Sequence, residues 1–142
     1  MKIYFLIGES NTGKTLTFHK LHDIMKADIV QFNELAYEEM FYFSTRGHKL
    51  ADVKDDFYCK YEDLTTKKTI VLFSMGDYYY DILDVINKEQ GQCDLLLCAL
   101  NQNIKNKSVF ENNINKVYSP TYIDHNFDVF NTAQAKSLLS HI

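Results

Sequence analysis

The chain of 142 residues contains only one arginine, Arg46, and its formal net charge is −4. A protein that binds a nucleic acid normally needs a basic surface that neutralises several phosphates. Neither the composition nor the charge balance of this chain provides one. We therefore do not expect a nucleic acid to be its main partner.

Long apolar runs and linker segments are also missing. No stretch approaches the ~20 consecutive apolar residues that cross a bilayer, and the segment "IYFLIG" after Lys2 is too short for a secretory signal. The single proline, Pro120, and the lack of repeats or low-complexity tracts leave no obvious linker. These features predict one cytoplasmic domain over residues 1–142, without a membrane partner.

Cysteine is scarce, and the three cysteines are Cys59, Cys93 and Cys98. They have no CxxC spacing, and two of them lie in apolar, strand-like segments. We interpret them as reduced and mostly buried, rather than as metal ligands or a disulfide.

Strand and helix patterns alternate along most of the chain. Nearly unbroken apolar runs predict central strands at residues 2–7, 69–73 and 93–100. Apolar side chains at spacings of three and four predict helices over 14–26 and 78–90. The core is therefore expected to form around three strongly apolar strands.

The segments between these elements predict further structure. We expect a short strand over 28–32, and a helix over 34–44 with Asn33 as its N-cap. Apolar and polar residues alternate over 56–63, which predicts a half-exposed strand in an antiparallel hairpin with the strand over 69–73.

The last third of the chain carries weaker signals. Ser108 and Glu111 have the spacing of a capping box, residues 116–119 suit a short strand, and Asn131 with Gln134 would open a C-terminal helix. Together, the patterns predict an α/β fold, a three-layer α/β/α sandwich with a mainly parallel sheet and one antiparallel edge strand.

The segment "GESNTGKT", residues 8–15, fits the pattern G-x-x-x-x-G-K-[ST] without a mismatch. The two glycines allow a tight turn whose N–H groups can face a phosphate, Lys14 can reach the β and γ phosphates, and Thr15 can place its hydroxyl on Mg²⁺. The candidate nucleotide-binding residues are Gly8, Glu9, Ser10, Asn11, Thr12, Gly13, Lys14, Thr15 and Leu16.

With its flanking strand and helix, this segment resembles the P-loop NTPase superfamily over residues 2–25. The resemblance implies a nucleoside triphosphate and Mg²⁺ at the carboxyl end of the first strand, within a three-layer α/β core. It does not choose a reaction. The guanine-reading N-K-x-D pattern is missing after "CDLLLCAL", so ATP is expected rather than GTP.

An enzyme of this superfamily needs an acidic residue at a neighbouring strand end. Asp77 is the best candidate, although Ser74, Met75 and Gly76 separate it from the apolar run before it. It could bind Mg²⁺ together with Thr15, act as a base towards an acceptor hydroxyl, or cap the next helix.

Other charged residues are weaker candidates for the same chemistry. Asp28 and Glu34 flank the expected second strand, where some kinases of this superfamily hold an acceptor. Arg46 could stabilise charge on a transferring phosphate. The candidate catalytic residues are Lys14, Asp77 and Arg46.

Two kinds of function remain open. The first is phosphoryl transfer from ATP to a small acceptor, or ATP hydrolysis. The second is a nucleotide-dependent switch or regulatory module, with or without turnover, that acts through a protein partner.

Overall fold

The computed structural model describes residues 1–8, 14–39, 56–105, 110, 115–118 and 127–142. The elements within these ranges are, in chain order, β1 (Lys2–Gly8), α1 (Lys14–Ala27), β2 (Phe32–Glu39), β3 (Phe57–Asp63), β4 (Thr69–Phe73), α2 (Tyr79–Glu89), β5 (Leu95–Asn101), β6 (Asn115–Tyr118) and α4 (Phe127–Leu139). None of these helices is long and apolar enough to cross a membrane.

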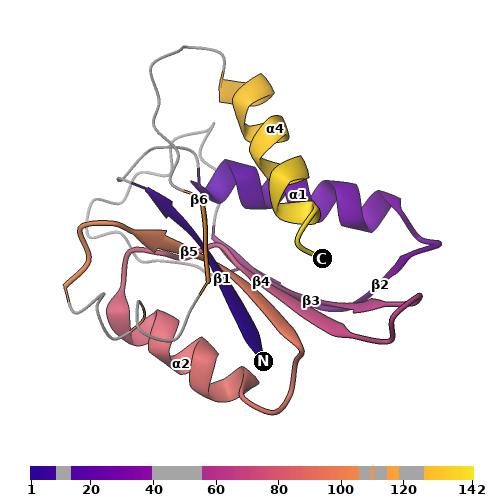
Figure 1. Cartoon of the computed structure of the whole chain (residues 1–142), viewed down its shortest axis with the longest axis horizontal. Helices are drawn as coiled ribbons and strands as arrows, with labels where there is room; N and C mark the ends of the chain where they lie inside the picture. Colours follow the sequence, from indigo (N-terminus) through magenta and orange to yellow (C-terminus); the bar gives the residue numbers. More distant parts are fainter. Residues whose placement is uncertain (9–13, 40–55, 106–109, 111–114, 119–126) are drawn as a thin grey trace.

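The strands form one mixed sheet in the order β2-β3-β4-β5-β1-β6 (Figure 1). Strand β1 lies between β5 and β6 and is parallel to both, and β4 is parallel to β5. Strand β3 lies between β2 and β4 and is antiparallel to both. The sheet thus has a parallel half built around β1 and an antiparallel half that ends at β2.

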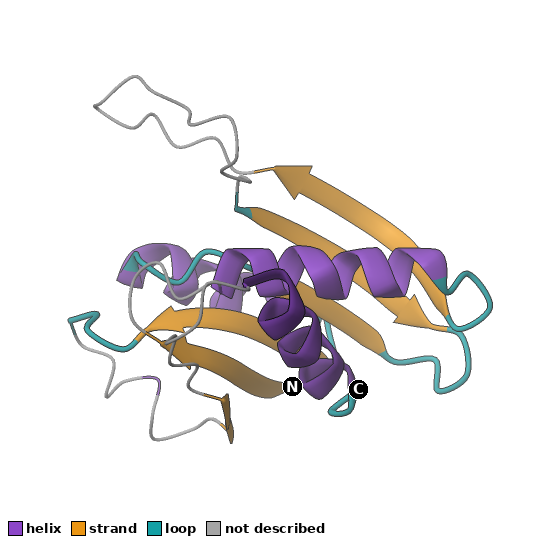
Figure 2. Ribbon diagram, turned by 90° about the horizontal axis from the view of Figure 1, so that it is seen from above, coloured by secondary structure: helices purple, strands orange, loops and turns teal. Residues whose placement is uncertain are grey.

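Both faces of the central strands are buried. Helices α1 and α4 cover one face, and α2 covers the other (Figure 1). Helices α1 and α4 also pack against each other (Figure 2). Along β5, Leu97 belongs to the cluster under α1, while its neighbours Leu96 and Cys98 belong to the cluster under α2. This alternation explains why the central strands are apolar throughout.

The strand expected over residues 28–32 and the helix expected over 34–44 are both wrong. Residues 28–31 form a turn, in which Asp28 accepts hydrogen bonds from Gln31 and Phe32, and the strand β2 begins only at Phe32. Residues 40–44 lie outside the described ranges. Glutamate, leucine and alanine favour a helix on their own, but pairing with β3 overrides that weak local preference.

The expected fold class is wrong as well. A mainly parallel, P-loop NTPase-like sandwich with a single antiparallel edge strand does not describe a sheet in which β2 and β3 are both antiparallel to their neighbours. The cause is local, because the predicted crossover helix between the second and third strands is replaced by the strand β2. The antiparallel hairpin of β3 and β4 is confirmed.

The ends of several elements also differ from expectation. Helix α4 begins at Phe127, so that Asn131 lies inside it rather than at its N-cap, and β6 begins one residue before the expected strand. Ser108 and Glu111 lie outside the described ranges. All three cysteines are free and buried, as expected.

Candidate functional site

Polar and glycine residues gather at one edge of the sheet, where β1, β4 and β5 end and β3 begins. Gly8 pairs with Asn101 in the parallel register of β1 and β5, and the carbonyl oxygen of Gly8 accepts a hydrogen bond of 2.9 Å from the N–H of Gln102. The N–H of Asn101 donates to the carbonyl oxygen of Gly76 at 2.8 Å. These bonds join the starts of three loops at one edge.

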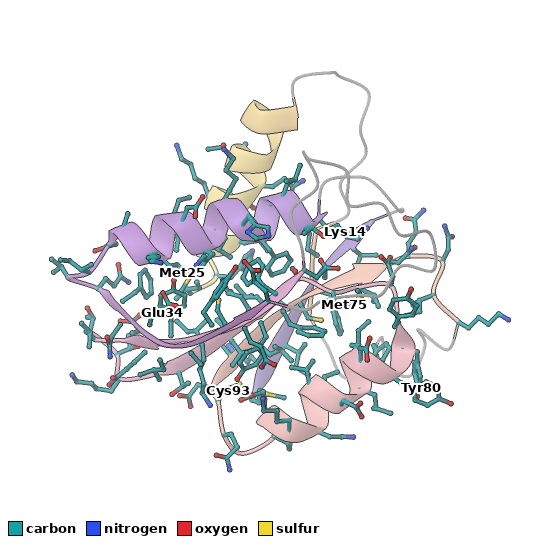
Figure 3. The ribbon with its side chains drawn as sticks, turned by 180° about the vertical axis from the view of Figure 1, so that it is seen from behind. Lys14, Met25, Glu34, Met75, Tyr80 and Cys93 are labelled. Carbon is teal, nitrogen blue, oxygen red and sulfur yellow. The ribbon has the colours of Figure 1, made fainter. Side chains whose placement is uncertain are left out.

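Lys14 is the first residue of α1 and lies at this edge (Figure 3). Its side chain is buried, and its Nζ donates a hydrogen bond of 3.1 Å to the carbonyl oxygen of Gly8. Burial lowers the pKa of Lys14, and the carboxylates of Asp77 and Asp56 partly offset that effect. The ammonium group is therefore placed between the end of β1 and two acidic residues.

Thr15 and Ser74 both bind one carboxylate, that of Asp56. The hydroxyls of Thr15 and Ser74 donate to Oδ1 of Asp56 at 2.8 and 2.9 Å. The N–H of Phe57 in turn donates to Oγ of Ser74 at 2.8 Å. This network fixes the carboxylate directly beside the threonine of the "GKT" sequence.

Asp56 carries an electrostatic cost in this position. Burial raises its pKa, and the hydrogen bonds from Thr15 and Ser74 lower it only in part. The negative charge of Asp77 raises it further, and His19 acts in the opposite direction. A desolvated carboxylate with a raised pKa beside a buried lysine is typical of functional sites.

The sequence pattern of an acid after an apolar strand does not point to Asp56, because Asp56 precedes a strand. It lies before the first residue of β3, and because β3 runs antiparallel to β4, the start of β3 lies beside the end of β4. The register pairs Tyr58 with Phe73, one residue from Ser74. An aspartate directly before the first strand of a predicted hairpin is the sequence signal that could have identified it.

Asp77 lies at the same edge but in a different environment. It is exposed, its Oδ1 accepts a hydrogen bond of 3.1 Å from Nδ2 of Asn101, and its N–H contacts the sulfur of Met75 at 3.3 Å. Tyr78, and not Asp77, occupies the N-cap position of α2. The interpretation of Asp77 as a helix cap is therefore wrong, while its two chemical interpretations remain predictions.

The other predicted residues are distributed unevenly. Gly8, Lys14, Thr15 and Leu16 are described, with Leu16 in the first turn of α1. Those outside the described ranges are Glu9, Ser10, Asn11, Thr12, Gly13 and Arg46.

The two alternative acids do not join the site. Asp28 follows the last residue of α1, which is the end remote from Lys14. Glu34 pairs with Tyr61 near the far end of the hairpin, and its charge acts on His22. Both residues therefore lie away from the edge of the sheet that holds Gly8, Lys14 and Asp56.

The oxygen atoms at this edge suit magnesium. Mg²⁺ in nucleotide sites usually binds one or two protein oxygen ligands, while substrate phosphates and water supply the rest. The hydroxyl of Thr15 and the carboxylate of Asp56, 2.8 Å apart, provide such a pair. No group of three or more His, Cys, Asp or Glu residues that could hold a metal occurs within the described ranges, but a site shared with phosphates does not require one.

The described edge therefore combines three features. The ammonium group of Lys14 is buried, the hydroxyl of Thr15 binds the carboxylate of Asp56, and the amide of Asn101 binds the carboxylate of Asp77. These groups can bind an anion and a hard divalent cation side by side.

Comparisons with protein-family models, with curated proteins and with solved structures find no match for this chain.

Proposed function

We propose that the chain binds a nucleoside triphosphate, ATP in preference to GTP, together with Mg²⁺ at the edge formed by Gly8, Lys14, Thr15 and Asp56. The observation that carries this proposal is the hydrogen bond from the Thr15 hydroxyl to Asp56, beside the buried Lys14. In phosphate loops of this sequence pattern, the lysine binds phosphates, and the threonine and an aspartate hold Mg²⁺.

Each described residue then has a chemical role. Lys14 exchanges the carbonyl oxygen of Gly8 for phosphate oxygens, which are stronger acceptors because they are charged. Thr15 and Asp56 hold Mg²⁺ directly or through water. The ion, when bound, neutralises charge on the phosphates.

Asp77 is proposed to act on the attacking group rather than on the metal. It is exposed, and Asn101 orients its carboxylate. From this position it can accept a proton from a hydroxyl or orient a water molecule. The proposed reaction is phosphoryl transfer to a small acceptor, or hydrolysis.

The alternative is a nucleotide-dependent switch that acts through a protein partner. The two functions differ in what stimulates turnover. A small-molecule panel that raises the rate of ADP release supports transfer, whereas slow hydrolysis that only a protein partner stimulates supports the switch.

We propose the cytoplasm as the site of action, where ATP is abundant and buried free cysteines stay reduced.

Thermal unfolding with and without nucleotide tests binding. MgATP at about 100 times its Kd adds about 2.7 kcal/mol to the free energy of unfolding, which for a chain of this length raises Tm by about 5–10 °C. Lys14→Met retains most of the buried stem but lacks the ammonium group, so its Tm should not respond. The matched control is Lys105→Met, because Lys105 is exposed and lies in the turn after β5.

The result that contradicts the proposal is an equal response of wild type and Lys14→Met to MgATP. The lack of any response in wild type, at millimolar MgATP or MgGTP, contradicts it equally. If MgGTP raises the Tm more than MgATP does, the proposed binding site is supported but the preference for ATP is contradicted.

A further inference from the structure

A cleft of about 250 Å³ lies between α2 and the antiparallel half of the sheet. Its walls come from β2, β3, β4 and α2, and they are formed by Glu38, Tyr58, Phe73, Asp81, Asp84, Val85 and Lys88. The volume falls just below the ~300–1,000 Å³ of ordinary small-molecule sites. The cleft therefore suits a small ligand and not a folded segment of another protein.

One wall of the cleft is aromatic and rigid. Phe73 is buried, and the hydroxyl of Tyr58 donates a hydrogen bond of 2.7 Å to Oε1 of Glu89. Glu89 is 1% exposed and forms an ion pair of 3.3 Å with Lys60. Because both ends of this chain of contacts are fixed, the ring of Tyr58 keeps one face towards α2.

The ring of Tyr58 already interacts with a cation. Nζ of Lys88 lies 4.5 Å from the centre of the ring, a distance at which the negative face of an aromatic ring attracts an ammonium group. Lys88 is exposed and extends from α2, so a ligand can displace it at little cost. The wall thus shows, within the protein itself, which kind of group it attracts.

The rest of the cleft lining is acidic. Asp81 and Asp84 lie on α2, and Glu38 lies on β2 beside its strand partner Tyr58. These three carboxylates stand against the single ammonium group of Lys88. No hydrogen bond or ion pair joins these three carboxylates to any residue in the described ranges. Carboxylates that line a cleft together with aromatic and apolar side chains favour a ligand with two positive charges and an apolar segment between them.

We propose that this cleft binds a small organic cation of the diamine class. One ammonium group lies over Tyr58, the apolar segment packs on Phe73 and Val85, and the second ammonium group pairs with carboxylates of α2. A bare metal ion would leave the aromatic and apolar walls unused. Diamine binding at this cleft does not require nucleotide binding, because only residues that line the cleft take part in it.

The position of the cleft gives the proposal its functional interest. Phe73 lines the cleft, and the next residue, Ser74, binds Asp56 at the edge described above. The cleft and the proposed phosphate site thus both lie at the end of β4. If both sites are occupied, a bound amine is well placed to influence the other site through β4.

Titration of the ¹⁵N-labelled protein with 1,4-diaminobutane tests the proposal. We expect saturable chemical-shift changes at amides of α2 and at Tyr58. The uncharged, equally long 1,4-butanediol should produce none. No saturable change, changes spread evenly over acidic surface residues, or equal changes with the diol would each overturn it.

Charge variants test the two walls separately. The double variant Asp81→Asn, Asp84→Asn should weaken diamine binding by at least about tenfold, whereas Asp23→Asn, which removes an exposed carboxylate from α1, should leave it unchanged. Lys88→Gln frees the ring of Tyr58 and should tighten binding by about threefold or more. Equal losses in the double variant and Asp23→Asn, or weaker binding in Lys88→Gln, would contradict the proposed site.

Discussion

The buried carboxylate of Asp56 is costly to ionise in the free protein, and we propose that this charge serves in metal binding. Its carboxylate is desolvated, and the neighbouring charge of Asp77 repels it, so that its pKa is raised. Hydrogen bonds from Thr15 and Ser74 orient the group without neutralising it. A bound divalent cation would supply the missing charge, as expected of a residue whose position serves binding rather than stability.

The substitution Asp56→Asn separates these two effects. The amide oxygen can still accept hydrogen bonds from Thr15 and Ser74, so we expect the Tm of the ligand-free protein to stay unchanged or to rise. The affinity for ATP in the presence of Mg²⁺ should fall at least about tenfold, or about 1.4 kcal/mol. Isothermal titration calorimetry measures this loss, with Asp23→Asn as the control that should bind as wild type does.

Without Mg²⁺, the affinities of Asp56→Asn and of wild type for ATP should differ by much less, because no metal ion then requires the carboxylate of Asp56. A variant that binds MgATP as tightly as wild type would show that Asp56 does not hold the ion.

The raised pKa of Asp56 also predicts a dependence on pH. Since Mg²⁺ requires the ionised carboxylate, affinity for MgATP should fall as pH decreases through the pKa of Asp56, which lies above the usual range for an aspartate. In the ligand-free protein, pH has the opposite effect on stability: the contribution of Asp56 favours the folded state more at acid pH than at neutral pH. The contribution of Asp56 to the free energy of unfolding is largest below its unfolded pKa and declines as pH rises through its folded pKa.

Two measurements on wild type and Asp56→Asn, from pH 4 to pH 8, test these expectations. Calorimetry gives the affinity for MgATP, and unfolding of the ligand-free protein gives the stability. The difference between the two proteins in MgATP affinity should shrink towards acid pH. A constant difference across this range would contradict the assignment.

At the scale of the elements, the contact between the turn after β4 and strand β5 positions Asp77. A Cβ atom on Gly76 would lie 2.7 Å from the carbonyl carbon of Ala99 and 2.8 Å from the backbone nitrogen of Leu100. Only glycine therefore allows the turn to pack on β5. This close packing places Asp77 where Asn101 can bind it.

The variant Gly76→Ala should lower the free energy of unfolding by about 1–3 kcal/mol, because the added methyl group meets backbone atoms that cannot rotate away. It should also weaken MgATP binding, since displacement of the turn breaks the bond between Gly76 and Asn101. Urea unfolding and calorimetry measure the two effects.

Gly91→Ala is the matched control. Gly91 has a φ of 76° and nothing within 4 Å of an added Cβ, so its substitution costs about 1–2 kcal/mol through the left-handed backbone alone. It lies between α2 and β5 at the opposite edge of the sheet. MgATP affinity should therefore stay unchanged in this variant, and an equal loss in both variants would contradict the role of the Gly76 turn.

Strand β2 illustrates why some elements resist prediction from sequence. Its residues favour a helix locally, but the register with β3 shifts between Glu34 and Ala36, so that Tyr37 lies on the same face as Glu34. The ring of Tyr37 then stacks on His22 and Phe57. These contacts depend on partners distant in the chain, and no local pattern contains them.

For the molecule as a whole, the central parallel strands and the antiparallel hairpin of β3 and β4 were predictable, and the edge strand β2 was not. Strands β1, β4 and β5 are buried on both faces, and burial of that kind leaves an unbroken apolar run in the sequence. The expected crossover helix is replaced by β2, which pairs with the outer side of β3. Strand β3 is therefore not an edge strand, and the sheet contains two antiparallel strand pairs where one was expected.

The candidate site follows the same division. Gly8, Lys14 and Thr15 were predicted because their spacing is a local pattern. Asp56 was not, because its place beside Thr15 depends on how the start of β3 lies against α1, a contact between residues 41 positions apart that no local pattern contains. The sequence thus predicted the residues of the proposed phosphate-binding side, and the tertiary structure was needed to find the acid on the proposed metal-binding side.

Thr15 and Asp56 together are proposed to hold the metal of a bound nucleotide. A crystal structure with a non-hydrolysable ATP analogue and Mn²⁺ in place of Mg²⁺ tests it most directly, since the anomalous signal of manganese locates the ion. We predict an ion about 2.0–2.3 Å from Oγ1 of Thr15, bound to phosphate oxygens and to Asp56 directly or through one water molecule. An ion held by Asp77 away from Asp56, or a nucleotide bound elsewhere, would contradict the claim.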